Sequence, residues 1–406
     1  MSKAEQFDVV IVGGGPAGLT LSLALSRFAR GIRIALVDRR PLEVPRDNRA
    51  SAIAASVRRA WTALEVWPAM EGEAQAITAM RITDSGPGDL SRPLFLSFEG
   101  DVAPGEPFAH MVPNRVSGQA LLDAVASKIT VVAPASVAGL QTSANSADLV
   151  LADGRILRAP LVVAADGAQS SLRQMSGIGV FSHDYRQTGL VTTITHELPH
   201  DGVAYQHFRP AGPFASLPLP GNRSSLVWTE KSADAPRFLA MGNEELAREI
   251  ESVMGSTLGT VGVDEDLMGF PLRLQLARQF VGPRLALVGD AAHVVHPVAG
   301  QGLNLGLKDV AALAEAVVEA MRLGLDHGSP AVLERYQSWR RLDTTGMALV
   351  TDGMNRLFSA DAPPVRALRD FGLGLVDRAG PVKAMMIRGA AGLSAHGPRL
   401  LSGLPI

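Results

Sequence analysis

The sequence predicts an α/β protein built around a parallel sheet, and three observations carry this prediction. Residues 7–40 read as an apolar run, a glycine-rich turn, a helix with Leu and Ala at helical spacing, and a second apolar run that ends in Asp38. Two later apolar runs, at 161–167 and 284–290, also end in an aspartate beside a glycine. Continuous apolar strands are typical of a parallel sheet that helices cover on both faces.

The segments between these runs divide into helical and β-rich parts. A helix is expected from Ser51 to Val66, closed by Pro68, and an amphipathic helix from Val116 to Lys128. Short strand-like pieces separated by Gly and Pro fill 77–107, and further strand candidates fill 137–166. The chain is therefore expected to leave the first domain and to return to it.

The second half of the chain predicts another sheet and a helical end. Residues 185–228 contain strand-like runs such as GLVTTITHE and SSLVWTE between Pro and Gly turns. A helix is expected from Gln301 to Leu323. From Pro330 onward the pattern is mostly helical, with breaks at proline-containing pairs such as Pro363-Pro364.

Composition excludes several classes of protein. With 406 residues, 47% of them hydrophobic and 19% charged, the chain can bury a large core. A net charge of -2 without a basic run argues against nucleic-acid binding. The absence of cysteine excludes disulfides and thiolate sites and suits a reducing cytoplasm. The uncharged stretch Val9 to Ser26 is interrupted by Gly13-Gly14-Gly15-Pro16, so we expect neither a membrane span nor a signal peptide, and a cytoplasmic location.

The glycine-rich turn has the pattern of a dinucleotide-binding site. Gly13, Gly15 and Gly18 follow a strand and open a helix, and Asp38 ends the next strand. In this pattern the first glycine makes the tight turn, the second lets the backbone approach a pyrophosphate, and the third allows helix and strand to pack closely. The acid can accept from a ribose hydroxyl. The alternative is a tight turn with a structural role only, and the motif by itself does not distinguish NAD from FAD.

Two further acids favour a long cofactor. Asp166-Gly167 ends one predicted strand, and Gly289-Asp290 ends another and leads into the glycine-rich stretch HPVAGQGLN. Ligands of an α/β sheet lie across the carboxyl ends of its strands. Two acids at strand ends far apart in the sequence therefore indicate a ligand that touches several strands.

These motifs together resemble the FAD-dependent aromatic hydroxylases of the para-hydroxybenzoate hydroxylase type. The resemblance rests on GGGPAG at 13–18, DGAQSSLR at 166–173 and GDAAHVVHPVAGQGLNLGLKD at 289–309, and it runs from Phe7 to about Leu325. Within that group the chain is most similar to the ring hydroxylases of ubiquinone biosynthesis. The stretches that carry this similarity are DNRASAI at 47–53, HDYRQTGLV at 183–191, AYQHF at 204–208, FASLPL at 214–219 and FPL at 270–272.

The resemblance implies a Rossmann-like FAD-binding domain with a β-sheet substrate domain and C-terminal helices. The expected division is 1–76, 105–180 and 278–330 for the FAD-binding domain, 77–104 and 181–277 for the substrate domain, and 331–406 for the helical region.

The implied activity is that of a monooxygenase. Non-covalently bound FAD is reduced by NADH or NADPH, reacts with O2 to a C4a-hydroperoxyflavin, and transfers one oxygen atom to an aromatic ring, here a polyprenylated phenol of ubiquinone biosynthesis. No second Gly-x-Gly-x-x-Gly follows a strand, so the nicotinamide donor is expected to dock transiently. Alternatives are hydroxylation of another aromatic compound, an FAD-dependent reductase of the same fold, and a non-catalytic FAD-binding scaffold.

The resemblance also assigns cofactor-binding residues. The loop Pro297 to Asn304 supplies backbone N–H groups for the negative charge of reduced flavin. Asp290 corresponds to the acid near the ribityl chain, and Asp166 to the acid that supports the pyrophosphate. Arg49 and Arg115 correspond to positions that face the cofactor, with surface arginines as the alternative. The full expected set is Gly13, Gly15, Ala17, Gly18, Asp38, Arg39, Arg49, Arg115, Asp166, Gly167, Gly289, Asp290, Pro297, Gly300, Gln301, Gly302, Leu303 and Asn304.

The substrate side is defined less sharply. A base that deprotonates the phenol would assist the reaction, and His183, Tyr185, Tyr205 and His207 are candidates, with Tyr205 and His207 foremost; packed strand residues are the alternative. A prenyl tail would need an apolar channel, or the same residues are ordinary sheet core. The expected substrate contacts are Tyr185, Gln187, Tyr205, His207, Phe214 and Leu217. The expected channel residues are Phe208, Phe214, Leu217, Leu219 and Trp228.

Asp290, His293 and His296 stand three residues apart, a spacing that places three metal ligands on one helical face. Pro297 and the glycines that follow indicate a turn instead, so no metal is expected. Both histidines are then interpreted as supports of the flavin loop, with His296 the nearer to the flavin.

The C-terminal region offers a contact surface. Met385, Met386 and Ile387 beside Lys383 and Arg388 fit a peripheral contact with the inner face of a membrane, an oligomer contact or a lid. A homo-oligomer and membership of a biosynthetic complex are further expectations.

Overall fold

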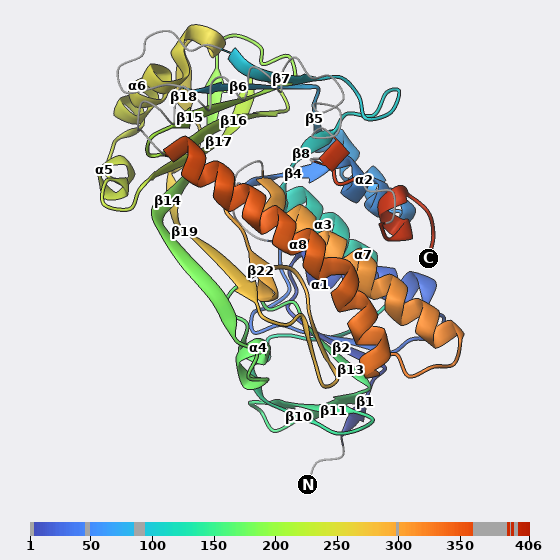
Figure 1. The fold of residues 1–406 in the computed structure, drawn as a ribbon. Helices are drawn as coiled ribbons and strands as arrows, with labels where there is room; N and C mark the ends of the chain where they lie inside the picture. The colour runs from blue at the N-terminus through green and yellow to red at the C-terminus, as the bar shows by residue number, and fades with distance from the viewer. Residues whose placement is uncertain are drawn as a thin grey trace.

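A six-stranded sheet, mainly parallel, forms the centre of the first domain (Figure 1). The computed structural model describes residues 4–44, 49–84, 94–297, 300–359, 388–389, 391–393 and 397–406. The four innermost strands of the six-stranded sheet are fully buried apolar runs, as a parallel sheet between two layers of helices requires. In order across the sheet, the strands are β20 (Val281–Gly282), β21 (Leu285–Leu287), β13 (Leu161–Ala164), β2 (Val9–Val12), β3 (Ile34–Val37) and β9 (Thr130–Val132).

Helices and two small sheets surround this sheet. Long apolar stripes on α1 and α7 pack into the same core cluster as the central strands. The helices are α1 (Pro16–Phe28), α2 (Ala55–Ala63), α3 (Asn114–Val125), α4 (Ser171–Met175) and α7 (Gln301–Arg322), with short 3-10 turns η1 (Trp67–Ala69), η2 (Glu71–Glu73) and η4 (Gly289–Ala291). The small sheets are β1 (Glu5–Gln6), β12 (Ile156–Ala159), β11 (Ala147–Leu151) and β10 (Val137–Thr142), and β4 (Ala50–Ala54), β8 (Ala109–Pro113) and β5 (Gln75–Ile77).

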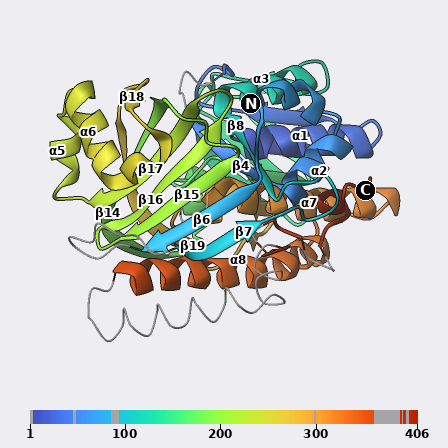
Figure 2. The ribbon, with the colours of Figure 1, turned by 90° about the horizontal axis from the view of Figure 1, so that it is seen from above.

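A nine-stranded sheet forms the second layer of the molecule (Figure 2). Its path runs through β22 (His293–Val294), β19 (Met268–Ala277), β14 (Val180–His196), β17 (Arg223–Lys231), β16 (Gly212–Leu219), β15 (Val203–Arg209), β6 (Ala79–Asp84) and β7 (Leu94–Glu99), and β18 (Val261–Val263) pairs with β14. The helices α5 (Ala235–Leu239) and α6 (Asn243–Met254) and the turn η3 (Gly255–Leu258) lie on its side away from the first domain.

The helix α8 (Pro330–Ser359) runs along α7 and reaches the nine-stranded sheet, so it spans both layers (Figure 1). The chain ends with the 3-10 turn η6 (Arg399–Ser402), which packs beside α2. Within the part of the chain that the structure describes, none of the helices is both long and apolar enough to cross a membrane.

The predicted α/β architecture with a parallel sheet, a second sheet and C-terminal helix is confirmed. The helix expected from Ser51 to Val66 is partly wrong, because its first residues are extended. Residues 50–54 form β4, which pairs with β8, and the helix starts only at Ala55. Tertiary pairing overrides local pattern here. The breaks expected at 363–364 and 380–381 lie outside the described residues.

Candidate functional site

The glycine turn between β2 and α1 leaves an open backbone surface. Gly13 has a φ of +115°, and a Cβ there would lie 2.2 Å from the carbonyl oxygen of Ala165. A Cβ on Gly18 would lie 1.9 Å from the carbonyl oxygen of Gly13. A Cβ on Gly15 would have no neighbour within 4 Å. The first and third glycines are therefore needed for packing, whereas the second exposes backbone at a helix N-terminus, where an anion is favoured.

Asp38 closes this turn from the end of the neighbouring strand β3. One carboxylate oxygen accepts from the backbone N–H of Gly14 at 2.7 Å, and the other accepts from the N–H of Arg40 at 2.9 Å. The carboxylate thus fixes the glycine turn and remains half-exposed, which leaves lone pairs for a ribose hydroxyl. The neighbouring Arg39 is exposed.

Asp166 stands at the end of β13, the strand beside β2. Its Oδ2 accepts from the backbone N–H of Ser171 at 2.8 Å, at the start of α4. Its Oδ1 is buried and has no hydrogen-bond partner among the described residues. The buried Arg173 donates to the carbonyls of Ala291 at 2.7 Å and Ala168 at 2.9 Å, and burial lowers its pKa. This arginine therefore ties the ends of β13 and β21 together.

Gly289-Asp290 follows β21, on the other side of β13. Gly289 has a φ of +61°, and its Cα would lie 3.0 Å from a Cβ on Gly306 of α7, so both glycines permit close packing. The Asp290 side chain is exposed to water, yet burial raises its pKa. These two properties agree if the carboxylate stands in a recess that is open to water but surrounded by protein.

The loop before α7 presents a helix N-terminus to the same region. Gly300 adopts the left-handed conformation, with a φ of +62°, and a Cβ on Gly302 would have no neighbour within 4 Å. Asn304 anchors the helix to β4: its Oδ1 accepts from the N–H of Ala54 at 2.9 Å, and its Nδ2 donates to the carbonyl of Ala52 at 2.7 Å. The 22-residue helix α7 thus starts with open backbone at Gly302. The side chain of Asn304 is already engaged, so any cofactor contact there falls to its backbone.

The three motifs share one edge of the sheet because β21, β13 and β2 are parallel neighbours. Open backbone at Gly15 and Gly302, the unpaired Oδ1 of Asp166 and the recessed Asp290 fit a long ligand with a pyrophosphate. The residues present therefore fit FAD. The individual contacts of Ala17, Gly167, Pro297, Gln301 and Leu303 with the cofactor remain predictions.

The two arginines expected at the cofactor differ in their surroundings. The Arg49 guanidinium lies over the ring of Phe270 in β19, 5.1 Å from its centroid, so it bridges the first domain and the nine-stranded sheet. Arg115 is about half-exposed and forms an ion pair with Glu73. Arg49 therefore lies between the two layers, while Arg115 stands at the surface at the start of α3.

The nine-stranded sheet has two faces with different coverings. Residues that pair across neighbouring strands share a face. His207 pairs with Phe214, and Phe214 pairs with Trp228. The Trp228 ring lies 4.6 Å from the Phe238 ring of α5, and α6 packs on the same cluster. We call this surface the helix-covered face; Tyr205 also packs against it.

This geometry corrects the expected roles of four residues. Tyr205, His207, Phe214 and Trp228 lie on the helix-covered face, away from the first domain, so they do not line a site between the sheet and the cofactor edge. His207 bonds to the hydroxyl of Thr83 through its Nδ1. The sequence shows the alternation of side chains along a strand but not which of the two faces is covered by α5 and α6.

The opposite surface faces the first domain, and we call it the inner face. Val191, Val227 and Ala215 pair in a row across β14, β17 and β16, and all three are half-buried. Leu217 lies on the same face and packs with Met111 of β8. Phe270, beneath Arg49, belongs to it as well. Of the predicted channel residues, Leu217, Leu219 and the fully buried Phe208 lie on this side.

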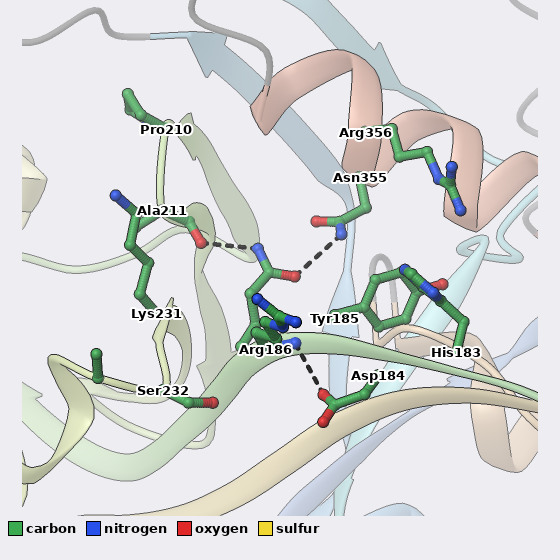
Figure 3. A pocket seen from close by; sticks show the side chains of 12 residues that line it. His183, Asp184, Tyr185, Arg186, Pro210, Ala211, Lys231, Ser232, Asn355 and Arg356 are labelled. Atoms are coloured by element: carbon green, nitrogen blue, oxygen red, sulfur yellow. Dashed lines mark hydrogen bonds between the residues drawn. The ribbon is translucent and has the colours of Figure 1, made fainter.

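A pocket of about 810 Å³ opens where β14 meets α8 (Figure 3). Gln187 spans it: its Oε1 accepts from Asn355 of α8 at 3.0 Å, and its Nε2 donates to the carbonyl of Ala211 at 2.8 Å. His183 and Tyr185 rise from β14 beneath Asn355 and Arg356. Gln187 thus contacts α8, and Tyr185 packs against His296. His296 and Pro297 lie just before α7, in the segment that we call the flavin-side loop. The role of Tyr185 and Gln187 in substrate binding remains a prediction.

Asp290, His293 and His296 do not converge. The chain forms the turn η4 and the short strand β22 there, so the helical face that a metal site requires does not exist. His293 bonds through Nε2 to Asp309 Oδ2 at 2.6 Å, whereas the fully buried His296 packs edge-on against Tyr185 with ring centroids 5.0 Å apart. Among the described residues, no group of three His, Cys, Asp or Glu side chains is placed to hold a metal.

Asp309 of α7 is the centre of a buried network that sequence reasoning did not identify. Its carboxylate accepts from His293, from the Gly289 N–H at 3.0 Å, and from Arg340 Nε of α8 at 2.7 Å. Burial alone would raise the pKa of Asp309, but His293 and Arg340 outweigh it, so the pKa is lowered. Asp309 lies inside the third motif, but nothing in the sequence pairs it with Arg340.

Known proteins are similar to this chain over nearly its whole length. A family model described as an FAD binding domain matches residues 6–349. The ubiquinone hydroxylase UbiL of Rhodospirillum rubrum is 44% identical over 98% of this chain and 93% of its own length. The 3-demethoxyubiquinol 3-hydroxylase of Escherichia coli is 36% identical, covering 95% and 98%. The crystal structure of the p-nitrophenol 4-monooxygenase PnpA of Pseudomonas putida superposes with a TM-score of 0.77 at 19% identity, covering 95% and 98%, which shows a shared fold.

Proposed function

The chain belongs to the family of FAD-dependent aromatic hydroxylases that contains the ubiquinone hydroxylases, and we propose that its substrate is a polyprenylated phenol of ubiquinone biosynthesis. The predictions of FAD as the cofactor and of a monooxygenase are confirmed by this membership. The observation that carries the proposal is that open backbone at Gly15 and Gly302 and the exposed Asp290 belong to motifs at one edge of the parallel sheet.

The chain contributes binding, orientation and a favourable field. When bound, FAD supplies the redox chemistry: it takes electrons from NAD(P)H and activates O2 for transfer of one oxygen atom to the ring. The open backbone at Gly15 and the N-terminus of α1 would hold the pyrophosphate. The N-terminus of α7 at Gly302 would offer backbone N–H groups and a positive dipole end to the negative charge of the reduced flavin.

The inner face orients the substrate. Val191, Ala215, Leu217 and Val227 form an apolar, half-buried surface that faces the first domain. A phenol ring held there would be shielded from water and oriented for reaction with the bound cofactor. Arg49 stands at the margin of this surface above Phe270 and can donate to a phenol oxygen or to the cofactor.

Prenylated phenols are sparingly soluble in water, which favours delivery from a membrane surface. The segment expected to make this contact, with Met385, Met386 and Ile387, lies outside the described residues, while Arg388 is exposed. Contact with a membrane, a homo-oligomer, membership of a biosynthetic complex and transient docking of the nicotinamide donor belong to the proposal.

The proposal is tested by coupling. Purified, FAD-loaded protein is given NADH or NADPH together with phenols that carry prenyl tails of increasing length, and nicotinamide oxidation and O2 consumption are recorded. We expect both rates to rise together when a prenylphenol is present. Nicotinamide oxidation without O2 consumption would indicate a reductase, and stimulation by phenols without prenyl tails alone would indicate a hydroxylase of another aromatic compound.

A further inference from the structure

A group of poorly paired buried polar atoms lies between the flavin-side loop and the pocket at α8. Both ring nitrogens of His296, the hydroxyl of Tyr185 and Oδ1 of Asp352 are buried, and none makes a hydrogen bond of ordinary geometry with the described residues. The Tyr185 hydroxyl nevertheless lies close enough to Asp352 for that carboxylate, besides burial, to raise the pKa of Tyr185. His296 is fully buried. Buried polar atoms are nearly always paired in folded proteins, so several poorly paired ones in one place call for a function.

These groups lie next to one another. His296 directly precedes Pro297, where the flavin-side loop begins, and its ring lies 5.0 Å from the Tyr185 ring. Asp352 of α8 acts on both neighbours: it counts among the causes that raise the pKa of Tyr185, after burial, and it partly offsets the burial that lowers the pKa of His296. Its Oδ2 is paired with Arg356 Nε at 2.9 Å. Tyr185 and Arg356 both line the open pocket (Figure 3).

We infer that Asp352, Tyr185 and His296 form a proton relay that connects the open pocket with the flavin-side loop. The inference rests on the proposed function, because that reaction needs such a path. The balanced equation of the hydroxylation is phenol + O2 + NAD(P)H + H⁺ → hydroxylated phenol + NAD(P)⁺ + H2O. Each turnover therefore takes one proton from solvent into a site shielded from water.

The side chains suit this transfer. A neutral imidazole has one N–H and one bare nitrogen, so it takes a proton on one side and releases another on the opposite side. Burial lowers the pKa of His296 to about 4, so the ring is neutral at pH 7 and does not retain the proton. The raised pKa of Tyr185 keeps its hydroxyl protonated, able to accept and donate in turn. His183 packs edge-on against Tyr185, and Arg356 pairs with Asp352. The further charged groups that line the same pocket are Asp184, Arg186 and Lys231.

A structural reading of the same residues makes different predictions. If His296 only fills space, H296Q, with a side chain of similar volume, should hydroxylate at the wild-type rate. If Tyr185 only packs, Y185F should also keep the wild-type rate. A relay predicts that both variants slow the step that consumes the proton, since positioned proton transfer contributes on the order of 100-fold to rates. Because the slowed step then limits turnover more strongly, the relay also predicts a larger solvent deuterium isotope effect in the variants than in the wild type.

The first test is chemical rescue. H296A is measured for prenylphenol hydroxylation with and without added imidazole. H200A is measured next to it, because His200 is buried as well but bonds the carbonyl of Leu219 and does not belong to the relay. We expect a loss on the order of 100-fold in H296A, recovery of at least tenfold with imidazole, and no effect of imidazole on H200A. A full rate in H296Q and Y185F would overturn the relay.

The second test does not depend on turnover. In protein labelled with ¹⁵N-histidine, the His296 signals are identified by their loss in H296Q and then followed in Y185F and D352N. The relay predicts a changed tautomer population of His296 in both variants and unchanged His200 signals. Unchanged His296 signals would refute the relay even if the wild type hydroxylates no prenylphenol, while changed signals together with an inactive wild type would refute only the proposed function.

Discussion

Replacing Asp309 by asparagine is expected to destabilise the whole cofactor edge. The buried carboxylate accepts from His293, Gly289 and Arg340, and these three donors belong to β22, the end of β21 and α8. The amide cannot serve all three donors, because one of its two oxygen positions becomes an NH2 group that faces them. Arg340, itself buried, then loses its main counter-charge.

The magnitude follows from the geometry. Removing one partner of a buried ion pair costs about 3–5 kcal/mol. Arg340 keeps a second carboxylate, Asp343 at 2.6 Å, so we expect the lower end, about 3 kcal/mol of unfolding free energy. The lowered pKa of Asp309 adds a pH dependence: its stabilisation is present above the unfolded-state pKa near 3.9 and is lost as the pH falls through the lower folded-state pKa.

The assay is urea unfolding of the FAD-free protein, with the flavin content of the purified variant measured in parallel. D153N is the control, because Asp153 forms an exposed pair with Arg155 that water screens, so its loss should leave the unfolding free energy nearly unchanged. A loss below about 1 kcal/mol in D309N, the value of a single ordinary hydrogen bond, would refute the proposed central role of this network.

Three further predictions concern the buried histidine, the glycines and the sheet face. The pKa of His296 is about 4 in the folded state and 6.5 in the unfolded state. The free energy of unfolding should therefore fall by about 3 kcal/mol as the pH drops from 6.5 to 4. Urea unfolding of H296Q should show a correspondingly smaller fall over the same pH range. G302V should have the same unfolding free energy as the wild type when FAD is absent, but it should bind FAD more weakly. G13A should be destabilised even without FAD. Equal FAD affinity of G302V and wild type would show that the cofactor lies elsewhere. L217W should impair hydroxylation per NAD(P)H oxidised, while Y205F and H207Q should retain it; the reverse pattern would place the substrate on the helix-covered face.

Local signals predicted the cofactor edge well. The roles of Gly13, Gly15 and Gly18 follow from the spacing of glycines between a strand and a helix, and each shows the packing or openness that its position requires. The fold class followed from uninterrupted apolar runs, which become the buried parallel strands.

The substrate side could not be predicted in the same way. Because side chains alternate along a strand, the sequence of β15 indicates that Tyr205 and His207 lie on one face of the sheet and their neighbours on the other. Only the packing of α5 and α6 decides which of the two faces these helices cover. Asp309 and Arg340 are 31 residues apart on two helices, and no local sequence pattern predicts their contact. Tyr185, His296 and Asp352 likewise meet only through the crossing of β14, the flavin-side loop and α8.

The transfer of oxygen from O2 to a prenylphenol is tested most directly by isotopic labelling. FAD-loaded protein is incubated with a prenylphenol, NAD(P)H and ¹⁸O2, and the mass of the product is measured by mass spectrometry. We expect a hydroxylated prenylphenol that carries one ¹⁸O atom for each nicotinamide oxidised in coupled turnover. A product without ¹⁸O, or nicotinamide oxidation that yields only hydrogen peroxide with every prenylphenol, would contradict it.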